Sequence, residues 1–119
     1  MNDHRYDLSE EEAAELAAKV AAGALALDDA EPGWYWKLDF NTLDMTHGWQ
    51  CVLGQLYGVF SHGLKDLKWS EEKADEMGVY IHNSADMPHN EWIARYAELQ
   101  ECWIGEAADR LSTRLLNSL

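Results

Sequence analysis

The chain has 119 residues, of which 47% are apolar, and a formal net charge of −13 from 22 acidic and nine basic side chains. This length suits one domain with one hydrophobic core, residues 1–119, and the apolar content predicts a folded chain. The charge argues against direct binding to nucleic acid or to an anionic membrane, because like charges repel. It suits a basic partner, or simply high solubility, which is the commoner reason for such a charge.

The N-terminal residues lack the apolar segment of a signal peptide, and no run of residues approaches the ~18 apolar residues of a membrane span. Cys51 and Cys102 lie far apart and form no CxxC motif. We therefore expect a cytoplasmic protein with reduced thiols.

Residues 9–27 carry the start signal and the spacing of an amphipathic helix. Ser9 and Glu12 have the spacing of a capping box, and acidic residues 10–12 suit the positive end of the helix dipole. Apolar residues then recur at helical spacing, at positions 13, 16, 17, 20, 24 and 27. Half of these are alanine, so a neighbouring helix is expected to approach closely.

Apolar and polar residues alternate between positions 34 and 40. Trp34, Trp36, Leu38 and Phe40 share one phase of a two-residue period, which is typical of a strand. We expect an extended segment or a short edge strand here, with residues 79–81 as its one candidate partner.

Residues 49–60 have the spacing of a helix with a broad apolar face. Gly54 and Gly58 fall on the opposite face, where the backbone of the alanine-rich helix can approach. We interpret this segment as the central helix of the fold. Gln55 is expected to hydrogen-bond a loop backbone. The residues assigned to core packing in and around this motif are Trp49, Cys51, Gly54, Gln55, Tyr57 and Gly58, together with Trp103 from the last helix.

Two further helices are predicted. Ser70 is a candidate N-cap for a short helix that ends at Gly78, and Asp86 and Pro88 open a long helix that reaches nearly to residue 119. The predicted fold is mainly α, a small orthogonal bundle of about four helices with a long C-terminal helix; a short β element near residues 34–40 stays open. The apolar stripe of the long helix is Trp92, Tyr96, Leu99, Trp103, Ala107 and Leu111.

The string CVLGQLYG at 51–58 resembles a motif in a family of small actinobacterial and actinobacteriophage proteins. The flanking stretches PGWYWKLDFNTLDM (32–45) and YAELQECWIGEAADR (96–110) extend the resemblance over roughly residues 31–110. The chain departs from the family pattern at Trp49, Gln50 and Cys102. No activity is attached to that family, so the resemblance implies an origin and a fold, and raises the expectation of a phage accessory protein.

Neither a catalytic nor a metal site is predicted. Cys51 with His47 four residues earlier is a candidate nucleophile and base, but no third group completes the site. His82 and His89, with Asp86 between them, could meet in one loop, yet the tight ligand pairs of zinc sites are absent. We expect no cofactor and no metal.

Trp34, Tyr35 and Trp36 are the candidate interaction residues. Three consecutive aromatic side chains cannot all face one core, and exposed aromatic residues are enriched at interfaces. The leading hypothesis is a non-enzymatic phage or prophage accessory protein that binds a host or phage protein, in the host cytoplasm if phage-encoded. An acidic DNA mimic or anti-defence inhibitor of a nucleic-acid-binding enzyme is the alternative. A cysteine-dependent enzyme is less favoured, and homo-oligomers stay open.

Overall fold

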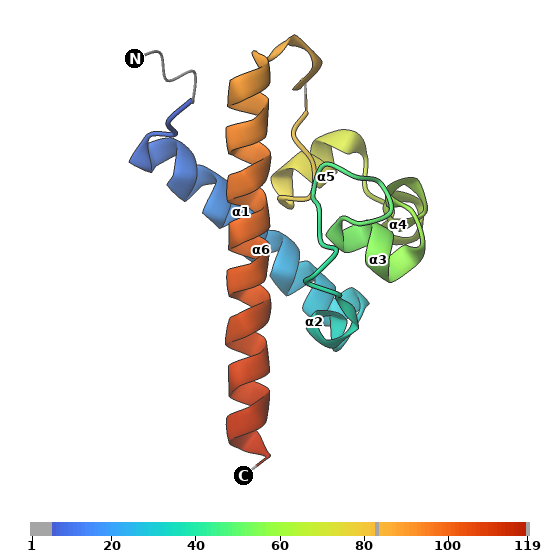
Figure 1. Cartoon of the computed structure of the whole chain (residues 1–119). Helices are drawn as coiled ribbons and strands as arrows, with labels where there is room; N and C mark the ends of the chain where they lie inside the picture. The colour runs from blue at the N-terminus through green and yellow to red at the C-terminus, as the bar shows by residue number, and fades with distance from the viewer. Residues whose placement is uncertain (1–5, 83, 119) are drawn as a thin grey trace.

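The computed structural model describes residues 6–82 and 84–118, and within these residues all regular structure is helical (Figure 1). The mainly α class and the long C-terminal helix are confirmed. The elements are α1 (Glu10–Ala30), α2 (Trp34–Lys37), α3 (Val52–Tyr57), α4 (Phe60–Leu67), α5 (Glu71–Glu76), the short 3₁₀ helix η1 (Ser84–Asp86) and α6 (His89–Asn117).

The centre of the fold is the crossing of α1 and α6, which is the most extensive contact between two helices (Figure 1). At the crossing Gly23 is buried, and a Cβ placed there would lie 1.9 Å from the carbonyl oxygen of Met77. The missing side chain therefore lets the chain after α5 lie directly against α1. The buried residues are Leu16, Val20, Ala24 and Leu27 of α1 and Tyr96, Leu99, Trp103 and Ala107 of α6.

Two tryptophans fill the core beside this crossing. Trp34 and Trp103 are both fully buried, and their rings meet edge to face with centroids 5.3 Å apart. The Trp103 indole Nε1 donates a hydrogen bond of 2.8 Å to the carbonyl oxygen of Gly78, which ends α5 with a φ of 71°. The core assignment of Trp103 is therefore confirmed, and its one polar atom has a partner.

The helix start signals are also confirmed. The Ser9 hydroxyl accepts from the Glu12 backbone N–H while the Glu12 carboxylate accepts from the Ser9 N–H, so the capping box is complete. Ser70 caps α5 by accepting from the backbone N–H of Lys73. These signals act within one turn and do not depend on the rest of the fold.

The prediction of an extended segment at residues 34–40 is wrong. The chain turns at Gly33, with a φ of 78°, into the single helical turn α2. Trp34 and Leu38, four residues apart, are buried, whereas Trp36 is 51% exposed. The alternation did not decide the structure because the buried indole of Trp34 is fixed by a hydrogen bond to Asp28.

The prediction of one central helix over residues 49–60 is also wrong. Two short helices, α3 and α4, form there in its place. Helix α3 ends because Gly58 has a φ of 94° and Val59 is extended. Trp49 precedes α3 and is 67% exposed, so its assignment to core packing is wrong. The expected approach of α1 to Gly54 is also wrong, because Gly54 lies against the backbone of Gly48 and Trp49.

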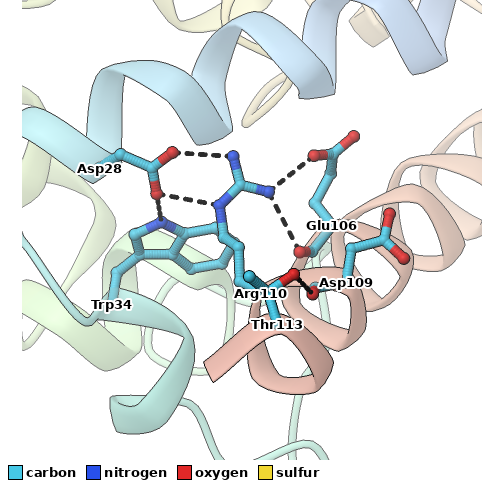
Figure 2. A network of polar contacts seen from close by, with 6 residues as sticks. All are labelled: Asp28, Trp34, Glu106, Asp109, Arg110 and Thr113. Carbon is cyan, nitrogen blue, oxygen red and sulfur yellow. Dashed lines mark hydrogen bonds and ion pairs between the residues drawn. The ribbon is translucent and has the colours of Figure 1, made fainter. Parts of the chain in front are cut away.

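Arg110 of α6 ties the end of α1 and the start of α2 together (Figure 2). Its guanidinium donates to both Asp28 carboxylate oxygens, at 2.9 and 2.8 Å, and to the Glu106 carboxylate at 2.8 Å. Asp28 also accepts from the Trp34 indole at 2.9 Å. At the other end of α1, Arg95 pairs with Glu12 through one nitrogen and with Glu91 of α6 through another.

Arg110→Ala is expected to lower the free energy of unfolding by about 1–3 kcal/mol, because Asp28 and Glu106 lose their charged donor. Urea titration at neutral pH measures it. Lys37→Ala, which removes a more exposed pair with Glu31, is the control and should cost less than about 1 kcal/mol.

The same contact makes stability depend on pH. The Arg110 hydrogen bonds, despite opposing desolvation, hold the pKa of Asp28 below its ordinary value. This contribution is present above the unfolded-state pKa of about 4 and is lost as the pH falls through the folded-state pKa. The stability difference between wild type and Asp28→Asn should therefore shrink below about pH 4; a difference independent of pH would contradict this origin.

Gly23→Ala is expected to destabilise the protein by about 2–3 kcal/mol, since its Cβ would overlap the Met77 carbonyl. Gly105→Ala on α6 is the matched control, because a Cβ there meets nothing within 4 Å. That change should raise stability by about 0.5–1 kcal/mol through helix propensity. Equal effects of the two substitutions in thermal denaturation would rule out the close approach at Gly23.

Candidate functional site

The most exposed tryptophan among the described residues stands on a loop of residues 44–51, here called the Trp49 loop. Trp49 is 67% exposed, whereas Leu43 and Met45 near the start of the loop are buried. Tryptophan is the residue type most enriched at the energetic centres of protein interfaces. The Trp49 loop is therefore the first candidate for a functional site.

Backbone hydrogen bonds hold this loop. The N–H of Asp44 donates to Gln50 at 3.1 Å, and the carbonyl of His47 accepts from Gln50 at 3.1 Å and from Cys51 at 2.9 Å. The Asp44 carboxylate accepts from the N–H of Thr46 at 2.9 Å and from its hydroxyl at 2.6 Å. The loop therefore has a defined conformation rather than a free tip.

Helix α3 contacts the backbone of the Trp49 loop at Gly54. A Cβ at this position would lie 2.3 Å from the Gly48 carbonyl oxygen and 2.8 Å from the Cα of Trp49. The same Gly48 oxygen accepts a 2.8 Å hydrogen bond from Phe60 at the start of α4. Glycine is needed at position 54 because the loop backbone occupies the space of a side chain.

Gln55 of α3 hydrogen-bonds the backbone at two places, at Asp39 before the Trp49 loop and at Gln50 within it. Its side-chain oxygen accepts from the N–H of Asp39 at 2.6 Å, and its amide nitrogen donates to the carbonyls of Asp39 and Gln50, both at 3.1 Å. The expectation that Gln55 bonds a loop backbone is confirmed. Three residues of CVLGQLYG thus serve the Trp49 loop: Cys51, Gly54 and Gln55.

Two adjoining hollows are lined in part by other residues of the Trp49 loop, although Trp49 itself lines neither. An apolar pocket of about 140 Å³ is lined by His47 and by buried and aromatic side chains, and a second hollow of about 240 Å³ contains Asp44 and Glu101. The two share Thr46 and Tyr96 as lining residues. The ring of His47 lies 5.3 Å from that of Trp49. We call Trp49, the apolar pocket and the acidic hollow together the Trp49 face.

Cys51 serves as a helix cap in this structure. It is 2% exposed, and its Sγ accepts a hydrogen bond from the Gly54 N–H at 3.3 Å. Burial raises the pKa of the thiol, which opposes formation of a nucleophilic thiolate. His47, the candidate base, accepts the Trp49 N–H at its Nδ1 instead. Each group therefore has a local structural role.

The three loop residues considered as metal ligands are not brought together. The backbone N–H of His82 donates to Asp75, and the ring of His89 stacks on Trp92 with centroids 6.1 Å apart. In residues 6–82 and 84–118, no three His, Cys, Asp or Glu side chains converge as metal ligands would.

Of the three candidate interaction residues, Trp36 is the most exposed. Trp34 is buried, and Tyr35 is half-buried with its ring edge against Trp34. Trp36 is 51% exposed, and the Arg114 guanidinium lies 4.8 Å from the centroid of its ring, a cation–π contact. Next to it is an open cleft of about 550 Å³ between α2 and the last turns of α6.

Sequence reasoning missed Trp49 because its spacing to Val52 and Phe60 is helical although no helix includes it. The signals that could have found it are local. Trp49 follows Gly48 and stands two residues before Cys51, which caps α3, so it lies outside the helix.

Comparison with protein families, curated proteins and solved structures finds no match to this chain. None of the described helices is both long enough and apolar enough to cross a membrane. The Trp49 face therefore has to be interpreted from its own geometry.

Cys51 in folded Cys102→Ser protein is expected to react with an alkylating reagent about two orders of magnitude or more slower than in urea, because labelling must await local opening. Mass spectrometry over time measures the rate. The Cys51→Ser variant, which keeps the half-buried Cys102, should label faster. Equally fast labelling of Cys51 in folded and unfolded protein would instead indicate an activated thiol.

Proposed function

We propose that this protein is a non-enzymatic accessory protein that acts by binding another protein through the Trp49 face. The observation that carries the proposal is Trp49 itself, whose ring is exposed while its backbone is held by the loop hydrogen bonds and by Gly54. An aromatic anchor held in place before binding loses little conformational entropy on association. Tryptophan is also the residue type most enriched at interface hot spots.

The proposed partner is a host or phage protein. The resemblance of residues 31–110 to actinobacterial and actinobacteriophage proteins supports a phage or prophage origin, and so a role in the host cytoplasm. The exposed Trp36 beside Arg114 is the alternative anchor, on α2 and α6, for an interface that does not include Trp49.

Trp49→Ala is expected to weaken partner binding by at least about thirtyfold, the effect of removing a hot-spot residue worth 2 kcal/mol. Wild type and variant are compared by affinity capture from actinobacterial lysate with quantitative mass spectrometry, and then by titration of the captured partner. Because the ring is largely exposed, the variant should keep the stability of the wild type.

Trp36→Ala is the matched control, since it removes an exposed ring of the same size from a different element. A loss confined to Trp36→Ala would move the interface to the cleft beside α6. Capture that neither substitution changes would contradict the aromatic-anchor proposal.

A second candidate function is inhibition of a nucleic-acid-binding enzyme by charge mimicry. The favouring observation is a set of exposed carboxylates around the start of α1, namely Asp7, Glu10, Glu11 and Glu15. Binding of this kind weakens steeply with ionic strength and does not depend on the ring of Trp49. Salt-sensitive capture of a partner that Trp49→Ala retains would therefore indicate charge mimicry.

A further inference from the structure

The apolar pocket of the Trp49 face is lined mainly by apolar and aromatic side chains. Met45 and Val79 are buried in its wall, and the rings of Phe60 and Tyr80 lie 5.6 Å apart beside them. With about 140 Å³ open to the surface, the pocket has room for one aliphatic side chain. Small apolar pockets of this kind commonly hold the anchor residue of a bound segment.

The neighbouring hollow is acidic. It contains Asp44 and the exposed Glu101, and neither carboxylate forms an ion pair with a described residue. The hydroxyl and N–H of Thr46 hold the pKa of Asp44 below its ordinary value, so this carboxylate is ionised at neutral pH. A cation entering the hollow would therefore meet two negative charges.

The rest of the molecule favours the same kind of partner. A net charge of −13 attracts basic segments and speeds their approach. The exposed ring of Trp49 can also stack with a guanidinium. Because the apolar pocket and the acidic hollow share Thr46 and Tyr96, the two bound side chains must be near neighbours in the partner.

We infer that the Trp49 face binds a basic protein segment in which an apolar side chain fills the pocket and a nearby Lys or Arg enters the hollow beside Asp44 and Glu101. The inference rests on the proposed protein-binding function and names the chemistry of the partner. The apolar side chain supplies affinity, and the cation supplies selectivity against acidic or neutral segments.

The test uses a library of random peptides displayed on phage, selected on the whole folded protein and depleted on the Trp49→Ala variant. The expected result is enrichment of peptides that carry an apolar residue close to Lys or Arg. One enriched peptide is then synthesised and titrated against wild type and variants by calorimetry.

Glu101→Lys should weaken that peptide by about tenfold or more, since it removes an attraction and adds a repulsion in the hollow. Asp109→Lys is the matched control, with the same change of charge at another exposed position on α6, and should cost about threefold or less. Equal losses would reduce the effect to long-range charge and overturn the inference.

Enriched peptides without basic residues that still depend on Trp49 would overturn the inference while leaving the proposed function standing. Failure to enrich any peptide dependent on Trp49 also overturns it, and capture with Trp49→Ala then decides the proposed function separately.

Discussion

The close crossing of α1 and α6 is the contact on which the other elements depend. Gly23 lets the chain at Met77 lie against α1, and this places Gly78 where its carbonyl accepts the Trp103 indole. Trp103 in turn packs against Trp34. A chain of this size buries few large side chains, so two fully buried tryptophans next to one crossing account for much of its apolar core.

Two arginines of α6 hold both ends of α1 by ion pairs. Arg95 and Arg110 bind opposite ends of α1, and Arg110 also orders the start of α2 through the carboxylate it shares with the Trp34 indole (Figure 2). In a strongly acidic chain these arginines also relieve repulsion between neighbouring carboxylates. Lys19, Lys37 and Lys73 pair with three further carboxylates, and the chain keeps a formal net charge of −13.

Three residues of the motif CVLGQLYG hold the Trp49 loop, while Val52 and Leu53 are buried in the core. Cys51 caps α3, Gly54 admits the loop backbone, and Gln55 bonds the backbone before the loop and within it. A motif that includes a cysteine invites a catalytic interpretation, but here burial disfavours the thiolate and the candidate base is already bonded. The part of the site that faces solvent is the tryptophan ahead of the motif.

Features whose causes lie within one or two turns of chain can be predicted from the amino-acid sequence alone. The Ser9–Glu12 capping box, the Ser70 cap and the apolar stripe of α6 follow from spacing alone, and so does the helical class. The path of residues 34–60 depends instead on contacts that form only in the folded protein. The position of Trp34 is set by its hydrogen bond to Asp28, which Arg110 also binds, and the position of Gly54 by the Gly48 carbonyl. Partners distant in sequence or on another element therefore override the local spacing of apolar residues. The exposure of Trp49, and hence the site, belongs to this second group, because a side chain's burial depends on which neighbours the whole fold brings to it.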